Sequence, residues 1–436
     1  MFAESGQSRP VCKLIQRNCR WKVPKCRVIA VLGTRPEAIK LALVIAEFRR
    51  RSEEFETAVI HTGQHRSMLD HALKIFKIKP DFDLDVMRPN QTLSSLTGRV
   101  LDTVENACHR FEPNIVLVQG DTTTAFASAL AAYYCKISVG HIEAGLRSGD
   151  IYNPFPEEAN RRLASVMTEI HFAPTALSRD NLLAEGVPAE KIVVTGNTVV
   201  DTLRALSDLP HSWEGTPLAG IPRDDGRRLV LVTSHRRESL GTDQQNMCLA
   251  LKDLVKKHPD IRVIYPVHMN PNVRSTVNGL LQDTERIHLT EPLGYIDFVS
   301  LLRSCFLVLT DSGGIQEEAP TFRKPVLVLR KVTERPEASQ FGMARIIGMS
   351  REAIVAEADR LLTDTDAYQD MSEGENPYGD GHSSERIVEA VSRWHQKKTP
   401  LLEADKQFKL PPRPHPRRRS SDLAPVAARA VSAGKE

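Results

Sequence analysis

The sequence lacks any long apolar run. No stretch of its 436 residues approaches the roughly 18 to 20 apolar residues that a membrane-spanning helix needs, so we expect no transmembrane segment and no membrane partner. Residues 1–26 contain six Lys or Arg residues but no apolar stretch of about 7–15 residues, and they do not resemble a secretory signal. An amphipathic targeting peptide is the weaker alternative, and we expect the protein in the cytoplasm.

Closely spaced cysteine pairs are also missing. Seven cysteines are an odd number in a long chain, which does not indicate a disulfide framework. Cys12, Cys19 and Cys26 recur at intervals of seven residues, whereas a zinc site usually contains a Cys-x2-4-Cys pair. The spacing favours reduced thiols, and we expect no bound metal.

Charge is nearly balanced overall, with a formal net charge of +3, but it is distributed unevenly. Residues 1–26 hold six bases and one acid, residues 397–436 hold ten bases and four acids, and residues 27–396 hold 42 bases and 50 acids. Basic tails of this kind are usually solvated, so we expect 1–26 and the Pro/Arg-rich stretch 397–436 to lie outside the fold. Aromatic residues do not alternate with the bases, and we expect no nucleic-acid partner.

The sequence does contain a repeated pattern of short apolar runs, each followed by a turn and a helix. The run 27–32 leads into Gly33, after which Thr34, Pro36 and Glu37 have the spacing of a helix start with a capping box. Further runs occupy 115–118, 229–232, 306–309 and 326–329. Continuous apolar strands that alternate with helices predict a parallel α/β architecture.

A turn-rich segment, about 198–228, divides the pattern into two halves of similar size. The strand–turn–helix pattern restarts on each side of it. We therefore predict two doubly wound, Rossmann-like domains, 27–200 and 201–380.

In open parallel sheets, ligands bind beyond the carboxyl ends of the strands. The turn after 306–309 contains Ser312, Gly313 and Gly314, and a predicted helix follows. The glycines allow close approach of a ligand, a helix start favours a phosphate, and Glu318 lies one turn further on, where it can meet ribose hydroxyls. The segment is neither GxGxxG nor GxxxxGK[ST], which weakens an NAD or ATP interpretation. An ordinary capped helix start is an equal alternative.

Carboxylates follow two other buried strands, at Asp121 and Glu143. Glu157 and Arg161 form a third feature, an i, i+4 pair that is most often a solvated surface ion pair. If the three carboxylates converge, they repel one another and their pKa values separate. That arrangement suits the abstraction and return of a proton.

Two basic turns occur in the second half. His235 and Arg236 follow 229–232, and His268 follows another strand. A lone histidine is usually structural, but two basic turns in the half that carries the glycine pair indicate a pocket for an anionic ligand.

Several motifs, in order, resemble those of the non-hydrolysing bacterial UDP-N-acetylglucosamine 2-epimerases. In the first half they are Gly33 to Lys40, Thr62 to Arg66, Gly120 to Thr124, His141 to Arg147 and Pro156 to Arg161. In the second half they are His235 to Glu238, Asp311 to Glu318, Thr333 to Ala338 and Asn376 to Gly381. The resemblance covers about 27–394.

This resemblance implies a glycosyltransferase-B-like fold with the active site in the interdomain cleft, a homodimer, and a last helix, about 381–396, that returns to the first domain. It implies the interconversion of UDP-GlcNAc and UDP-ManNAc without NAD or metal. The implied route eliminates UDP to give a 2-acetamidoglucal, to which UDP adds again with the opposite configuration at C2.

The resemblance also implies roles for individual residues. The implied catalytic set is Asp121, Glu143, Glu157 and His235. The implied substrate-binding set is Arg35, Lys40, Arg161, His268, Phe298, Ser312, Gly313, Gly314, Glu318 and Arg335. Phe298 matches the residue that packs on uracil.

Many bacterial members bind a second UDP-GlcNAc as an activator. The matching positions are Gln64, Ser67, Asn90 and Arg236, together with His268. Ser67 and Asn90 replace a long polar residue and an arginine, and loss of the arginine removes a phosphate partner. We therefore expect weakened or absent substrate activation, and a rate-versus-substrate curve without strong sigmoidicity.

Three alternatives remain open. A hydrolysing epimerase would release UDP and free ManNAc with similar carboxylates. A glycosyltransferase could share the fold and the UDP-binding half, but it would not need three carboxylates in the first half. A catalytically silent nucleotide-sugar sensor would not need them either.

Overall fold

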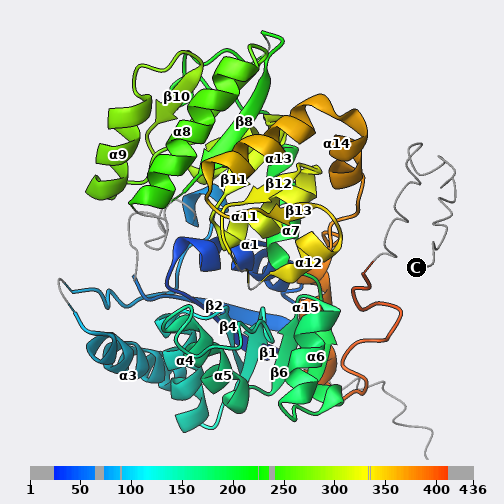
Figure 1. Cartoon of the computed structure of the whole chain (residues 1–436). Helices are drawn as coiled ribbons and strands as arrows, with labels where there is room; N and C mark the ends of the chain where they lie inside the picture. The colour runs from blue at the N-terminus through cyan, green and yellow to red at the C-terminus, as the bar shows by residue number, and fades with distance from the viewer. Residues whose placement is uncertain are drawn as a thin grey trace, which may run out of the picture.

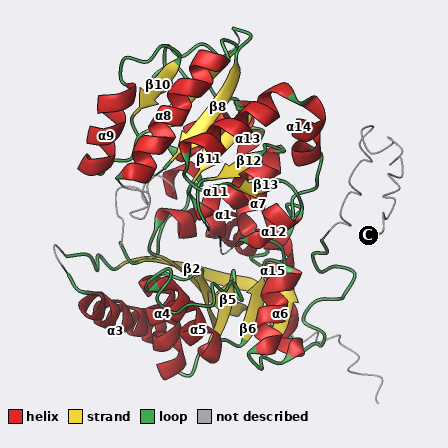
Figure 2. Ribbon diagram, viewed as in Figure 1, coloured by secondary structure: helices red, strands yellow, loops and turns green. Residues whose placement is uncertain are grey.

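The computed structural model describes residues 24–63, 73–88, 91–223, 225–234, 241–331, 333 and 335–410. These residues form two α/β halves, stacked one above the other in Figure 1, with helices on both faces of each sheet (Figure 2). The prediction of two doubly wound parallel domains is confirmed, because neighbouring strands in both sheets pair in parallel. Within these ranges, none of the helices has both the length and the apolar character needed to cross a membrane.

The first sheet has seven strands in the order β3-β2-β1-β4-β5-β6-β7. Its strands are β1 (Cys26–Leu32), β2 (Phe55–His61), β3 (Phe82–Asp83), β4 (Ile115–Gln119), β5 (Ser138–Ile142), β6 (Ile170–Ala173) and β7 (Ile192–Val194). The helices of this half are α1 (Arg35–Arg50), α3 (Leu93–Phe111), α4 (Thr123–Tyr134), α5 (Glu157–Met167), α6 (Ala176–Ala184) and α7 (Thr198–Ser207), with a 3-10 turn, η1 (Ala189–Lys191).

The second sheet has six strands in the order β10-β9-β8-β11-β12-β13. Its strands are β8 (Arg228–Thr233), β9 (Ile261–Pro266), β10 (Ile287–Thr290), β11 (Leu307–Thr310), β12 (Val326–Val328) and β13 (Ala344–Ile346). The following helices are α8 (Thr242–Lys257), α9 (Pro271–Leu281), α10 (Tyr295–Ser304), α11 (Gly313–Glu318), η3 (Ala319–Phe322), α12 (Pro336–Gln340), α13 (Arg351–Thr363), α14 (Thr365–Ser372) and α15 (Ser383–His395).

The strand order reverses once in each sheet, between β1 and β4 and between β8 and β11. At such a switch point the two following connections run to opposite faces of the sheet and leave a crevice beyond the strand ends. The turns after these four strands are therefore the places where the topology favours a ligand.

The start of α1 follows the predicted capping pattern. Thr34 is the N-cap, Pro36 lies in the first turn, and Thr34 and Glu37 form a capping box. One carboxylate oxygen of Glu37 accepts hydrogen bonds from the backbone N–H groups of Gly33 at 2.6 Å and Thr34 at 2.7 Å. The cap fixes the entry of the chain into α1 beside the switch point.

Helices α7 and α15 join the two halves. Helix α7 begins inside the segment expected to be a turn-rich link, and it packs against α1 of the first half and α10 and α11 of the second. Helix α15 follows the second half in sequence but packs against α1 and α7, and Figure 1 shows it beside the lower half. One hydrophobic cluster consequently includes residues from both halves, such as Phe48, Leu203, Leu302 and Val391.

Residues 397–410 pack against the first domain, so the expectation that the chain from 397 onwards lies outside the fold is wrong for this stretch. The backbone N–H of Phe408 donates to Val194 O at 2.9 Å, and the N–H of Val194 donates to Gln407 Oε1 at 3.0 Å. Leu402 and Phe408 are buried. Strand β7 is an edge strand, and an open edge leaves backbone N–H and C=O groups without partners. The segment 397–410 supplies partners for such groups, and its two apolar side chains are buried against the domain. Residues 1–23 and 411–436 lie outside the described residues.

Candidate active site between the two domains

A cavity of about 490 Å³ lies between the carboxyl ends of the two sheets. Its walls come from the turns after β1, β4 and β5 on one side and after β8, β9, β10 and β11 on the other. Ten of the predicted site residues line it: Arg35, Lys40, Asp121, Glu143, His268, Phe298, Ser312, Gly314, Glu318 and Arg335. The cavity therefore includes both topological switch points.

Asp121 follows β4, in a turn that is held from three directions. Its carboxylate accepts a hydrogen bond from Arg161 Nη2 at 2.5 Å, and its backbone carbonyl accepts one from Asn160 Nδ2 at 2.9 Å. The ring of His141 donates to the carbonyl of Gly120 at 2.7 Å, and burial lowers the pKa of His141 to about 4. A neutral His141 therefore fixes the turn while Arg161 fixes the Asp121 side chain.

Glu143 follows β5 and is buried at the base of the cavity. It adopts a φ of 67°, a left-handed conformation that costs a non-glycine residue about 1 kcal/mol or more and that is concentrated at functional sites. Its carboxylate accepts hydrogen bonds from Lys40 Nζ at 2.6 Å and from the amide of Gln119. Burial raises the pKa of Glu143 despite the attraction of Lys40. This carboxyl is therefore a stronger base than an exposed glutamate.

Lys40 connects the two domains. Its Nζ lies 2.6 Å from Glu143 in the first domain and 3.1 Å from Glu317 in the second, and Glu317 also accepts from Arg335 Nε at 2.7 Å. Burial lowers the pKa of Lys40, but the two carboxylates outweigh it and the net shift is upward. Burial would raise the pKa of Glu317, but Arg335 and Lys40 hold it below its usual range. The network therefore keeps both cations charged at the cavity wall.

Glu37 has a second role besides the cap. Its other carboxylate oxygen accepts a hydrogen bond from the hydroxyl of Thr122, in the turn that carries Asp121. Burial raises the pKa of Glu37 to about 7 against the opposing effect of these hydrogen bonds. Glu37 thus ties the start of α1 to the turn after β4.

On the second domain, the turn after β11 is held by its neighbours. The Ser234 hydroxyl donates to Asp311 Oδ2 at 2.9 Å, and the backbone N–H of Ser312 donates to Thr310 Oγ1 at 2.9 Å. Helix α11 starts at Gly313 and continues directly into η3. An added Cβ at Gly314 would meet only Ser312 Oγ, at 4.0 Å, so the backbone here is open to a ligand.

Glu318, Tyr295 and Phe298 line the same cavity from the second domain. The Tyr295 hydroxyl donates to Glu318 Oε1 at 3.4 Å. Burial raises the pKa of Glu318 to about 7. The combination offers a carboxyl group for hydroxyls and an aromatic ring for a planar base.

Some predicted residues lie elsewhere. Glu157 is the first residue of α5 and is not among the side chains that line the cavity. Its neighbour Glu158 is the fully buried carboxylate and pairs with Arg161 at 3.0 Å. Arg161 lies behind Asp121 rather than on the cavity wall, and Gly313 lies between two lining residues. The residues outside the described ranges are His235, Gln64, Ser67, Asn90 and Arg236.

Sequence reasoning missed three contributors, Gln119, Glu317 and Tyr295. Gln119 is the last residue of β4, so its position at a strand end could have identified it. Glu317 immediately precedes Glu318 in α11, so the helix motif that identified Glu318 also contains it. Tyr295 begins α10, after a proline-containing turn, where nothing in the spacing indicated a polar partner.

A family model for UDP-N-acetylglucosamine 2-epimerase matches residues 47–392. A probable UDP-N-acetylglucosamine 2-epimerase of Ralstonia nicotianae is 50% identical over 374 residues, which cover 84% of this chain and 99% of that protein. The UDP-N-acetylglucosamine 2-epimerase of Escherichia coli K12 is 48% identical over 369 residues, covering 84% and 98%.

Among solved structures, the UDP-GlcNAc 2-epimerase of Neisseria meningitidis bound to UDP-GlcNAc is similar, with a TM-score of 0.78 and 45% identity. The match covers 84% of this chain and 99% of that chain. With these matches over most of its length, and with ten of the predicted site residues around one interdomain cavity, the chain belongs to the UDP-N-acetylglucosamine 2-epimerase family.

Proposed function

We propose that the protein catalyses the reversible C2 epimerisation of UDP-GlcNAc to UDP-ManNAc, by elimination of UDP to a 2-acetamidoglucal and re-addition of UDP. The observation that carries the proposal is that two differently held carboxylates and a glycine-containing helix start line one cavity. The family membership and the substrate named for the Neisseria structure support the same substrate.

UDP would bind to the second domain. The backbone at Gly313 and Gly314 and the Ser312 hydroxyl would donate to the diphosphate, as helix starts commonly do. Glu318 would accept hydrogen bonds from ribose hydroxyls, and Phe298 would pack on uracil. The sugar would then extend toward the first domain, where Asp121 and Glu143 lie.

Proton transfer is assigned to the first domain. In the elimination, a base removes the proton from C2, the C1–O bond breaks, a C1–C2 double bond forms and UDP leaves. In the return step a proton adds to the opposite face of C2 while a diphosphate oxygen attacks C1. Two acid/base groups in different environments suit this sequence.

Glu143 and Asp121 provide such a contrast. Glu143 is buried with a raised pKa, while the Asp121 side chain is 25% exposed and held by Arg161. We propose these two as the acid/base pair. Glu157 remains the third proposed carboxylate of the set, but it starts α5 outside the cavity lining, so we assign it no step.

The departing diphosphate needs fixed positive charge. Arg35 and Arg335 line the cavity and would supply it. For Lys40 we propose a different role from direct phosphate binding, because its ammonium is already shared between Glu143 and Glu317. Lys40 would act as a positioning residue that holds the base and the two domains together.

The hydrolysing alternative differs in what captures the glycal. If water reaches the glycal before UDP does, free ManNAc results, so retention depends on closure of the two domains over the cavity. NMR analysis of the products from UDP-GlcNAc separates the two reactions. Nucleotide-bound ManNAc supports epimerisation with retained UDP, and accumulation of UDP with free ManNAc contradicts it.

We also propose that the working form is a homodimer. Large apolar side chains are exposed on two helices that pack against each other, Tyr133 and Tyr134 on α4 and Leu163 and Val166 on α5. Exposed apolar surface of this kind favours burial against another chain. Light scattering should give twice the mass of one chain, and a monomer at working concentration would contradict the proposal.

A further inference from the structure

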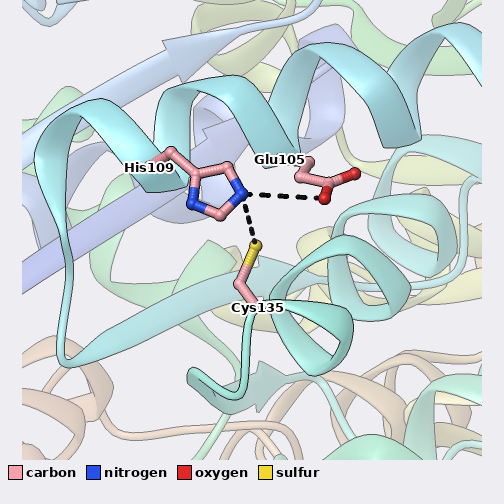
Figure 3. A group of neighbouring side chains, drawn as sticks. All are labelled: Glu105, His109 and Cys135. Carbon is pink, nitrogen blue, oxygen red and sulfur yellow. Dashed lines mark hydrogen bonds and ion pairs between the residues drawn. The ribbon is translucent and has the colours of Figure 1, made fainter.

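Three side chains with metal-binding chemistry meet at the far end of α3 and α4. Glu105 and His109 lie one turn apart near the end of α3, and Cys135 is the C-cap residue of α4 (Figure 3). His109 Nε2 lies 3.6 Å from Glu105 Oε1 and 4.0 Å from Cys135 Sγ. All three ligand atoms lie within 4.8 Å of one another.

This cluster is separate from the interdomain cavity. Asp121 precedes α4 and Cys135 ends it, and a helix of 12 residues is about 18 Å long. The cluster thus lies near the amino ends of the strands, away from the cavity, because β5 begins three residues after Cys135. The His109 side chain is 65% exposed and that of Glu105 is 39% exposed, so an ion can reach the group from solvent.

The spacing is close to that of a tetrahedral zinc site. Zinc bonds of about 2.3 Å to sulfur and about 2.0–2.2 Å to nitrogen and oxygen place neighbouring ligand atoms about 3.4–3.6 Å apart. The separations of 3.6 and 4.0 Å from His109 Nε2 require shifts of a few tenths of an ångström, and the separation between Glu105 and Cys135, which is within 4.8 Å, requires a shift of up to about 1 Å. Rotation of the exposed Glu105 and His109 side chains can supply these shifts. One thiolate, one imidazole and one carboxylate form a mixed set that suits zinc better than magnesium or calcium, which prefer oxygen.

We propose that Glu105, His109 and Cys135 form a zinc-binding site that joins the ends of α3 and α4, with water as the fourth ligand. The ligands escape a search for closely spaced cysteines because His109 and Cys135 are 26 residues apart and come from different helices. The site is independent of the proposed epimerase reaction, since none of the three residues lines the interdomain cavity.

An ordinary surface ion pair is the simplest competing explanation. Glu105 and His109 are an i, i+4 pair, and such pairs are common on helices without any metal. Cys135 adds a sulfur atom 4.0 Å from the imidazole, which a helix ion pair does not require. The Cys135 thiol also contacts the buried Cys108 thiol, so metal binding rather than position distinguishes the two explanations. His382 and Glu385 provide a matched control, an exposed pair on another helix with a 3.2 Å separation.

The test uses the full chain, stripped with a chelator and kept reduced, in four forms: wild type, C135S, H109Q and the control H382Q. Zinc affinity is measured by competition with a chromophoric chelator, and Co2+ is added separately to detect a sulfur-to-cobalt charge-transfer band. Because added metal ions can also bind weakly to other cysteines and histidines, the differences between variants are the readout. Melting curves of the metal-free proteins show whether each variant folds.

We expect C135S and H109Q to bind one fewer zinc equivalent, or to bind it at least about tenfold more weakly, than wild type and H382Q. The cobalt band should be lost or reduced in C135S and H109Q alone, and epimerase turnover should be equal in all four. Equal zinc binding and equal cobalt spectra in C135S and wild type would overturn the proposal. If C135S fails to fold, unaltered zinc and cobalt binding by H109Q would overturn it equally.

Discussion

Lys40 is the cation on which two buried carboxylates from different domains depend. Its Nζ lies 2.6 Å from Glu143 and 3.1 Å from Glu317. The substitution K40M keeps a long side chain but removes the charge. Glu317 then retains Arg335 at 2.7 Å, whereas Glu143 loses its closest cation.

The expected loss is large because the pair is buried. Removing one partner of a buried ion pair typically destabilises a protein by about 3–5 kcal/mol, since the other charge is left without compensation. For a domain of 150–250 residues, each kcal/mol lowers the melting temperature by about 2–4 °C, so K40M should melt about 6–20 °C below wild type. The matched exposed pair, Lys191 and Glu169 at 2.8 Å, has side chains 38% and 40% exposed, so K191M should cost about 0–1 kcal/mol.

A second substitution tests the cause. The E143Q change removes the carboxylate that K40M leaves without its cation, so the K40M/E143Q double variant should melt above K40M. Scanning calorimetry gives the melting temperatures of wild type, K40M, E143Q, K40M/E143Q and K191M. A K40M that melts like K191M, or a double variant that melts below K40M, would refute the role assigned to Lys40.

Three further predictions concern the site. E143Q should lower kcat by about 10²–10⁴-fold while UDP affinity measured by titration calorimetry stays near wild type, and retained turnover would remove Glu143 from proton transfer. A methyl group at Gly314 has room within the protein but lies on the cavity lining. The G314A variant should therefore keep its stability or gain up to about 1 kcal/mol, while UDP binds about tenfold or more weakly. An unchanged Kd for UDP would contradict its close approach to this backbone. Burial raises the pKa of Glu37 from 4.5 to about 7, so the folded state holds this proton more tightly than the unfolded chain. That stability is fully present below about pH 4.5 and is lost as pH rises through about 7, so wild type should lose more melting temperature over this window than E37Q, and parallel curves would contradict it.

Local spacing predicted the parts of the site that depend on local structure. The capping box of Thr34 and Glu37 involves neighbours in sequence, so its chemistry is visible without the fold. Asp121 and Glu143 follow neighbouring buried strands of one sheet, and the carboxyl ends of parallel strands lie at the same end of the sheet, so their proximity also followed from the pattern. The turn at Ser312 was predicted in the same way for the second sheet, but its position opposite the two carboxylates depends on the packing of the domains.

Partners that are distant in sequence could not be predicted. Lys40 and Glu317 are 277 residues apart, and only the packing of the two domains brings them together. At the start of α5 the sequence offers two adjacent glutamates, and the orientation of the helix decides that Glu158 rather than Glu157 is buried against Arg161. Residues 397–410 have the composition of a solvated tail, and their charge content hides the two apolar residues, Leu402 and Phe408, that pack against the domain.

The most direct test is incubation of the full-length protein with UDP-GlcNAc in D2O, followed by NMR of the sugar. Elimination and re-addition predict UDP-ManNAc that carries deuterium at C2, together with deuterium gradually entering C2 of the remaining UDP-GlcNAc. UDP-ManNAc that keeps its original hydrogen at C2, or UDP-GlcNAc that is never converted while UDP binds normally, would contradict proton exchange at Asp121 and Glu143.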